Sequence, residues 1–233
     1  MLSRVLSGLI GCGALLAAAD VRGTISINRK LTHRTVTAPA GLYQHGAAVD
    51  LGRDREEDPI AFERSHVAVY LEAALSPSTG SGEPQMEQRE RQFAPDLLVI
   101  PRGATVSFPN FDPIFHNVFS LSKAKSFDLG NYAKGDTRRV TFSSPGLVAV
   151  YCHLHPNMSA TIVVAPSAFA TRADRDGNFV LKDVPPGTYT LVAWHKSAGT
   201  FHKTVVQTAA GASEVNFVLP YVEPNANDHV ARR

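Results

Sequence analysis

The stretch "GLVAVYCHLHPNMSATIVV" (residues 146–164) places a thiol, two imidazoles and a thioether between two apolar runs that alternate like β-strands. Successive side chains of a strand point to opposite faces, so Cys152 faces the core while His153 points away from it. The chain then turns at a Pro-Asn dipeptide and enters a second strand. This pattern predicts a loop in which His155 and Met158 curl back over the sulfur of Cys152.

Strand patterns also dominate the rest of the chain, and no long helical period appears. Alternating or β-branched runs recur between turn signals such as Pro101-Arg102-Gly103 and Asp176-Gly177. We therefore predict an all-β fold built of sandwiches or barrels. The net charge is only +2 and the basic residues are scattered, which argues against a nucleic-acid or membrane surface.

The N-terminus has the pattern of a signal peptide. Arg4 precedes an apolar run over residues 5–16, and three alanines ending at Ala19 form a cleavage site before Asp20. An alternative interpretation treats Cys12 as the lipidated cysteine of a lipoprotein, but the apolar stretch before it is short. No run reaches the roughly 20 apolar residues of a membrane span, so we expect no transmembrane segment and a periplasmic or secreted protein.

Removal of this leader leaves Cys152 as the sole cysteine, in a compartment where an unpaired thiol is a liability. An internal disulfide is then excluded. Cys152 is either buried and inert, or paired with another chain, or held as a thiolate by a metal.

A fourth potential ligand, His116, begins another apolar strand in "NFDPIFHNVFS". One thiolate, two imidazoles and a more distant thioether are the donor set of blue-copper electron-transfer sites. Structural zinc more often takes two or more cysteines, which this chain lacks. Taken singly, each of these residues fits ordinary packing or surface polarity; taken together, they favour copper.

The segment from Leu97 to Ala165 resembles a cupredoxin of the plastocyanin and amicyanin type. The resemblance rests on "VIPRGATVSFPNFDPIFHNVFS" and on the Cys-x-x-His-x-x-Met loop. It implies a Greek-key β-barrel or sandwich that binds one type 1 copper per chain. The implied copper ligands are His116, Cys152, His155 and Met158, and Asn117 matches the asparagine that ties the two ligand-bearing segments together.

His153 follows the cysteine directly, where multicopper oxidases place a ligand of a coupled copper cluster. Those enzymes also need a histidine just before the cysteine, where this chain has Tyr151, and no His-x-His pair occurs elsewhere in the chain. We therefore expect His153 to be an exposed polar residue and the protein not to be an enzyme.

The C-terminal segment resembles a carboxypeptidase regulatory-like, or transthyretin-like, β-sandwich, on the basis of "DRDGNF", "VPPGTY" and the strands after them. The resemblance names a fold and not an activity. Asp174 and Asp176 lack the further ligands of a calcium loop, so a hairpin turn explains them better. His195 and His202 have no third ligand in view, and we interpret them as strand and turn residues.

The predicted organisation has five parts, and one ambiguity concerns whether residues 20–72 belong to the cupredoxin or to the C-terminal sandwich. The strand in "HVAVYLE" suits either domain, and residues 20–72 complete the C-terminal sandwich if the cupredoxin is inserted between its strands. The parts are a signal peptide (1–19), an N-terminal strand with a polar insertion (20–63), the cupredoxin domain (64–166), the regulatory-like sandwich (167–222) and a polar tail (223–233).

The predicted function is one-electron transfer between a redox donor and an acceptor in the cell envelope. Two alternatives stay open: a copper-trafficking or storage module, and a binding scaffold whose copper site is empty. For electron transfer, His155 is the expected exit route for the electron. We expect Pro113, Ile114 and Pro156 to form an apolar patch around it.

Overall fold

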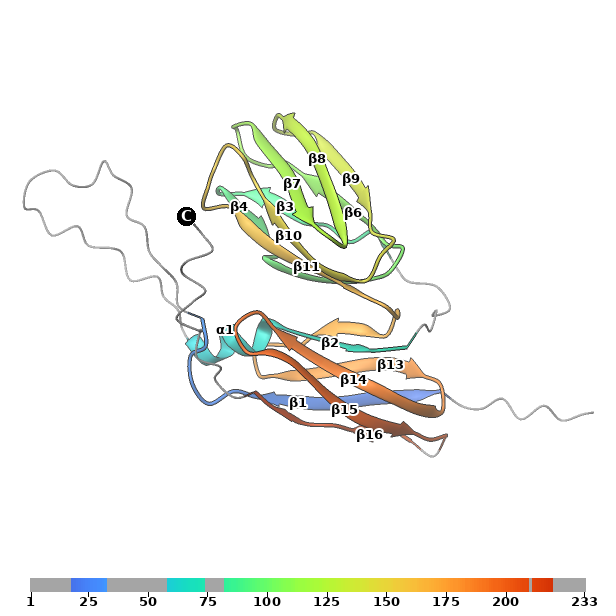
Figure 1. Cartoon of the computed structure of the whole chain (residues 1–233). Coiled ribbons are helices and arrows are strands. Elements are labelled where there is room, and N and C mark those ends of the chain that lie inside the picture. Colours follow the sequence, from blue (N-terminus) through green and yellow to red (C-terminus); the bar gives the residue numbers. More distant parts are fainter. Residues whose placement is uncertain (1–17, 33–57, 74–81, 210, 220–233) are drawn as a thin grey trace, which may run out of the picture.

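The computed structural model describes residues 18–32, 58–73, 82–209 and 211–219. Within these ranges the chain is all-β apart from one short helix, as predicted. The strands form two sandwiches, one above the other in Figure 1. No helix in these ranges is long and apolar enough to cross a membrane.

Several sequence-based expectations fall outside the described residues. These are residues 1–17 of the signal peptide, including Cys12, most of the polar insertion before the helix, and the polar tail. Ala19, the expected last residue of the leader, is the first residue of a strand.

The ligand-bearing sandwich, which holds the predicted copper ligands, is built from nine strands. A five-stranded sheet in the order β5-β11-β10-β7-β8 packs against the antiparallel pairs β6–β9 and β3–β4. The strands are β3 (Glu87–Arg89), β4 (Gln92–Ala94), β5 (Leu97–Pro101), β6 (Thr105–Pro109), β7 (His116–Ser122), β8 (Lys125–Tyr132), β9 (Thr137–Thr141), β10 (Gly146–Tyr151) and β11 (Ser159–Ala165).

The terminal sandwich, which contains the first and last described strands, consists of two sheets. One has the order β13-β1-β16, with β17 also paired to β1, and the other has the order β12-β2-β14-β15. The strands are β1 (Ala19–Ser26), β2 (Val67–Leu71), β12 (Ala170–Arg172), β13 (Asn178–Val184), β14 (Gly187–His195), β15 (Gly199–Gln207), β16 (Ser213–Glu214) and β17 (Phe217–Val218).

The pairing of β2 corrects one predicted boundary. β2 pairs antiparallel with β12 and β14, both in the terminal sandwich, so the cupredoxin range 64–166 began too early. β1 pairs with β13, β16 and β17 and with no strand of the ligand-bearing sandwich. This pairing supports the interpretation in which residues 20–72 complete the terminal sandwich and the other sandwich is inserted into it.

Each sandwich has its own apolar core, as the alternation of its strands requires. The core of the ligand-bearing sandwich includes Cys152 and Met158, which are 4% and 1% exposed, together with Val148 and Val150. Tyr151, on the opposite face of β10, is 43% exposed. The predicted orientation of this strand is therefore confirmed.

A third, smaller cluster joins the two sandwiches. Leu97 and Val163 from the ligand-bearing side pack with Ala68 and Trp194 from the terminal side. The sandwiches are therefore in direct apolar contact.

A polar contact crosses the same boundary. His66 Nε2 lies 2.8 Å from Asp96 Oδ1, and His66 Nδ1 lies 2.7 Å from the carbonyl oxygen of Phe62. The His66 ring also stacks on Phe62. His66 thus ties the end of helix α1 (Pro59–Ser65) to the start of β5.

The sequence did not predict the helix α1 (Pro59–Ser65) because it has only seven residues. Its signals are local: the Asp58 side chain caps it by accepting from Ile60 N–H at 2.8 Å, and Pro59 occupies the first turn. The strand β8 was also missed, since most of its residues are only partly buried or exposed and its turn lacks Gly and Asn.

The predicted turn at Asp176-Gly177 is confirmed. The Asp174 side chain accepts hydrogen bonds from the N–H groups of Asp176 and Asn178 at 2.9 and 2.8 Å. Gly177 has φ of +89°, and a Cβ built on it would lie 2.4 Å from the carbonyl oxygen of Ile25. This position therefore needs glycine for two reasons, its backbone angle and its contact with β1.

Gly199 provides a matched control, because its φ is +87° but no atom lies within 4 Å of a built Cβ. We expect Gly199→Ala to lower the free energy of unfolding by about 1–2 kcal/mol through backbone strain alone. Gly177→Ala should cost about 2 kcal/mol more, because the methyl group collides with β1. Urea denaturation followed by the fluorescence of Trp194, the sole tryptophan, measures both. Equal losses would contradict the role assigned to the Ile25 contact.

Candidate metal centre

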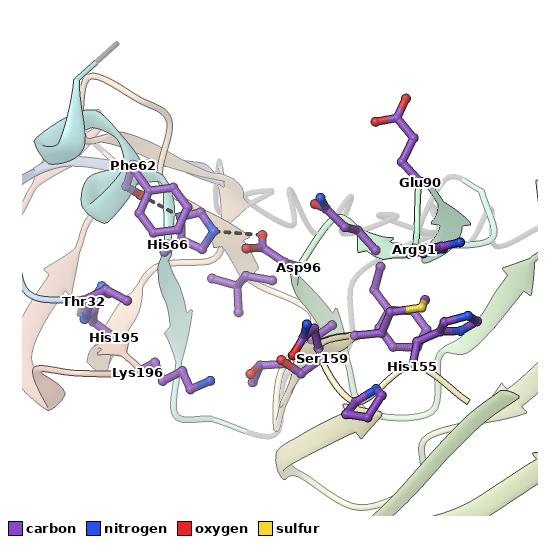
Figure 2. Close-up of a pocket in the computed structure, with 18 of the residues that line it drawn as sticks. Thr32, Phe62, His66, Glu90, Arg91, Asp96, His155, Ser159, His195 and Lys196 are labelled. Carbon is purple, nitrogen blue, oxygen red and sulfur yellow. Dashed lines mark hydrogen bonds and ion pairs between the residues drawn. The ribbon is translucent and has the colours of Figure 1, made fainter. Parts of the chain in front are cut away.

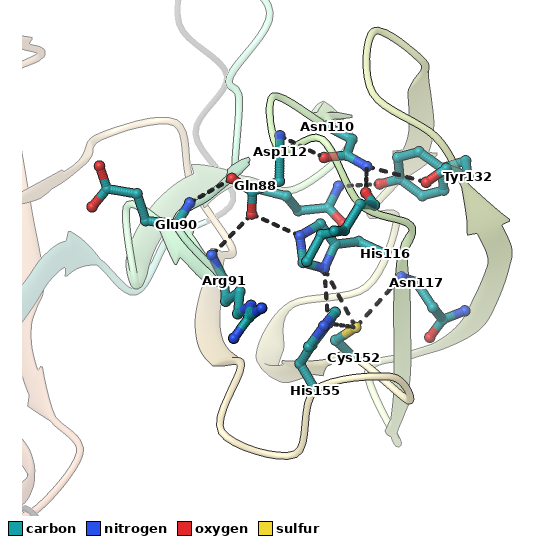
Figure 3. A network of polar contacts seen from close by, with 11 residues as sticks. Gln88, Glu90, Arg91, Asn110, Asp112, His116, Asn117, Tyr132, Cys152 and His155 are labelled. Carbon is teal, nitrogen blue, oxygen red and sulfur yellow. Dashed lines mark hydrogen bonds and ion pairs between the residues drawn. The ribbon is translucent and has the colours of Figure 1, made fainter. Parts of the chain in front are cut away.

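Three side chains with metal-binding atoms converge at one end of the ligand-bearing sandwich (Figure 3). His116 is the first residue of β7, and Cys152 directly follows β10. His155 lies in the loop between β10 and β11, and its carbonyl oxygen accepts a hydrogen bond from Met158 N–H at 2.9 Å. The structure thus brings together residues that lie 36 and 39 positions apart in the sequence.

The spacing of the donor atoms suits a single ion. His116 Nδ1 and His155 Nδ1 are 3.1 Å apart, and Cys152 Sγ lies 3.9 and 3.7 Å from them. Metal bonds of about 2.0 Å to nitrogen and 2.3 Å to sulfur in a trigonal arrangement require donor spacings of about 3.5–3.7 Å. The measured distances bracket these values, so the residues present fit a bound metal.

Met158 is buried in the same core cluster as Cys152. The Met158 side chain is 1% exposed, so its thioether is shielded from water. Met158 stays the predicted fourth ligand.

A carboxylate that the sequence did not identify contacts the first histidine. Asp112 Oδ2 lies 2.7 Å from His116 Nε2, and the His116 side chain is wholly buried. Since an ionised carboxylate only accepts hydrogen bonds, the proton is on Nε2 and the lone pair of Nδ1 faces Cys152 and His155. Nothing in the sequence marks Asp112, because its contact depends on the path of the loop before β7.

The surroundings of His155 favour its neutral form. Burial lowers the pKa of His155, and the nearby His116 and Arg91 lower it further, against a smaller opposing effect of Asp112. A metal binds the neutral imidazole, so a lowered pKa extends the pH range in which His155 can act as a ligand.

Asn117 connects the two segments that carry the ligands. Its backbone N–H donates to Cys152 Sγ at 3.5 Å, and its side-chain oxygen accepts from His153 N–H at 3.4 Å. Its amide nitrogen donates to Asp128 Oδ1 at 2.6 Å, which holds the side chain in place. Asn117 therefore has the contacts expected of the bridging asparagine.

His153 points away from the three donors, as predicted. Its ring stacks on Phe119 with centroids 3.7 Å apart, and its Nε2 lies 3.5 Å from Asp128 Oδ2. The side chain is 54% exposed. Within the described ranges, His153 does not belong to the group of potential metal ligands.

His195 has a different role from the one considered for a second metal. Its Nε2 lies 3.0 Å from Glu63 Oε2, and its Nδ1 accepts from the N–H groups of Ser197 and Ala198. Both ring nitrogens are thus engaged, and His202 is exposed on β15. His195 and His202 are strand residues, as expected, but the buried partner Glu63 was missed because it lies on the unpredicted helix.

A cleft of about 900 Å³ separates the ligand loop from the terminal sandwich (Figure 2). His155 and Met158 line one wall, and Trp194 and Lys196 line the opposite wall. Arg91, in the turn between β3 and β4, lines it beside His155. One approach to the candidate metal centre therefore passes between the two sandwiches.

Comparison with known proteins gives partial matches to two kinds of domain. Residues 155–220 match the family model of the carboxypeptidase regulatory-like domain. No curated protein matches the sequence.

Among solved structures, the chain is similar to a copper-containing nitrite reductase from Thermus scotoductus SA-01, with 26% identity and a TM-score of 0.35. This match covers 37% of the chain but only 23% of the reductase. A purple cupredoxin from Nitrosopumilus maritimus, with 26% identity and a TM-score of 0.33, matches 35% of this chain over 99% of its own length. An amicyanin variant in its reduced Cu(I) form, with 19% identity and a TM-score of 0.34, matches 41% of this chain over 97% of its own.

These likenesses cover only parts of the chain. The structure brings together His116, Cys152 and His155, three of the four ligands that the cupredoxin resemblance implies. The chain therefore resembles a cupredoxin in its ligand-bearing sandwich and a carboxypeptidase regulatory-like domain in residues 155–220.

Proposed function

We propose that the protein is a type 1 copper protein that carries single electrons, with one copper per chain held by His116, Cys152, His155 and Met158. The observation that carries this proposal is the cluster of two imidazole nitrogens and one thiol sulfur, all within 4.8 Å of one another. Two imidazoles, one thiolate and a thioether suit copper better than zinc, which prefers more thiolates, or magnesium, which prefers oxygen.

When bound, copper supplies one-electron exchange between Cu(I) and Cu(II). The side chains of this protein contribute a site that needs little rearrangement. His116 is oriented by Asp112, and the Cys152 sulfur accepts a hydrogen bond from the backbone N–H of Asn117. Because the donors are held before the metal arrives, both oxidation states meet similar surroundings.

The electron is expected to leave through His155, which is only partly buried. Pro113 and Pro156, predicted members of an apolar patch, are exposed, and Ile114 is partly buried. Phe115 and Leu154, which flank the two histidine ligands, are 60% and 44% exposed and extend the apolar surface beyond the predicted residues. Such a surface suits brief contact with a redox protein, because apolar contact excludes water without requiring tightly matched charges.

The position of His153 favours a carrier over an enzyme. A coupled copper cluster needs several imidazoles near one another, and the His153 ring instead contacts Phe119 and Asp128. The likeness to a nitrite reductase is compatible with this, because this chain matches only 23% of that protein.

We further propose that the protein works in the cell envelope, where its donor and acceptor would also be located. The support is the signal-peptide pattern of residues 1–19 and the single cysteine that remains after it. A thiolate bound to copper is protected from forming disulfides in that compartment.

Visible absorption of the copper-loaded protein tests the proposal. We expect an intense thiolate-to-copper band in the native protein and none in Cys152→Ser, which should keep its fold because the flanking strands retain their core. Circular dichroism of the metal-free variant checks the fold. An unchanged band would exclude Cys152 as a ligand, and a native protein that binds copper without the band would favour trafficking or storage.

Met158→Leu should behave differently, because a thioether would be a weaker copper ligand than a thiolate or an imidazole. We expect the coloured site to remain and its reduction potential to rise, since a donor that helps to stabilise Cu(II) is lost. Redox titration of the visible band measures this. Loss of copper altogether would mean that Met158 is more than an axial ligand.

His153→Ala decides between carrier and catalyst. Because its ring points away from the thiol, we expect one copper per chain in both the native protein and the variant, with unchanged colour. Metal analysis of purified, copper-loaded samples gives the ratio. A second copper that disappears in the variant would indicate a shared catalytic cluster.

A further inference from the structure

Asp112 is, among the described residues, the carboxylate that hydrogen-bonds directly to one of the predicted copper ligands. We propose that Asp112 positions His116, fixes its proton on Nε2 and thereby lowers the reduction potential of the copper. This inference rests on the proposed function and assigns a positioning residue that the cupredoxin resemblance did not supply.

The carboxylate is held from three directions (Figure 3). Its Oδ1 accepts from Glu90 N–H at 2.7 Å, and its Oδ2 accepts from Arg91 N–H at 2.9 Å and faces His116 Nε2 at 2.7 Å. Asp112 is 8% exposed. Three donors around a nearly buried anion leave little freedom for the side chain to rotate away from His116.

The two backbone donors come from a strained turn. Glu90 and Arg91 join β3 to β4 with φ of +54° and +57°, a conformation that residues with side chains rarely adopt. A two-residue turn of this kind normally uses Asn and Gly. The hydrogen bonds to Asp112 stabilise this turn, so the hairpin and the histidine share one carboxylate.

The backbone on the other side of Asp112 is also fixed. The Asn110 side chain accepts from Asp112 N–H at 2.9 Å and donates to the carbonyl oxygens of Ile114 and Tyr132 at 2.9 and 3.1 Å. Asn110 is fully buried. The loop before β7 is therefore built to hold Asp112 against His116 rather than merely to connect two strands.

The carboxylate keeps its charge in this setting. The N–H groups of Glu90, Arg91 and His116 converge on the carboxylate at 2.7–2.9 Å, and hydrogen bonds from several donors stabilise its ionised form. An anion that accepts the Nε2 proton makes Nδ1 a stronger donor, and its charge favours Cu(II) over Cu(I). Both effects lower the reduction potential.

The test uses the copper-loaded full chain and compares Asp112→Asn with Glu90→Gln. Glu90→Gln removes a neighbouring negative charge from an exposed side chain but keeps the N–H group that Asp112 accepts. We expect Asp112→Asn to shift the Cu(I)/Cu(II) equilibrium at least tenfold toward Cu(I), which is about 59 mV for one electron. Glu90→Gln should shift it less than threefold.

A second measurement reads the hydrogen bond itself. In the Cu(I) form, which is diamagnetic, the Nε2–H proton of His116 should exchange slowly with water in the native protein and in Glu90→Gln, and rapidly in Asp112→Asn. Asp112→Glu retains the charge, so it should shift the Cu(I)/Cu(II) equilibrium less than threefold. Its Nε2–H proton should still exchange slowly. Asp112→Glu replaces Asp112→Asn in the test if the latter does not hold copper.

The outcomes distinguish the role of Asp112 from the proposed function as a copper protein. An unchanged potential in Asp112→Asn, equal shifts in both variants, or a rapidly exchanging Nε2–H in the native protein would overturn the role of Asp112. If Asp112→Glu has to replace Asp112→Asn, a native reduction potential combined with rapid exchange of Nε2–H in Asp112→Glu would also overturn the role of Asp112. Absence of a thiolate-to-copper band in the native protein would instead contradict the proposed function.

Discussion

The antiparallel pairing of β10 with β11 is the constraint on which the rest of the structure depends. Its last pair, Tyr151 with Ser159, closes the loop that carries three of the four proposed ligands. The same alternation that buries the valines of β10 sends the Cys152 sulfur into the core. On β11, alternation also turns Val163 outward to Trp194 of the terminal sandwich. One hairpin thus sets the geometry of the site and the position of the second domain.

Hydrogen bonds then refine what the hairpin places. A loop closed by two strands fixes where a sulfur lies, but not which nitrogen of a neighbouring imidazole carries the proton. That choice is made by Asp112 on one side of His116 and leaves Nδ1 facing the thiol. Asn117 links the thiol to β7 from the other side. Apolar packing therefore supplies position, and polar contacts supply the protonation and orientation that metal binding needs.

The parts predictable from sequence are those encoded by local patterns. Strand alternation predicted the all-β fold, and a short loop spacing identified Cys152 and His155. Asp112 was missed because its contacts with Glu90 and Arg91 span more than twenty positions and follow from a turn without the usual Asn and Gly. The position of β2 was ambiguous for a related reason, since a buried apolar strand pairs equally well with either sandwich until the topology is known.

The contact between the sandwiches connects the terminal sandwich physically to the candidate metal centre. Apolar packing of Leu97 and Val163 on Trp194, together with the contact between His66 and Asp96, holds the terminal sandwich beside the ligand loop. A partner that reaches His155 through the cleft would meet Lys196 on the far wall. Under the proposed function, this second wall would limit the orientations in which a partner can approach His155, and the terminal sandwich would add selectivity by shape and charge.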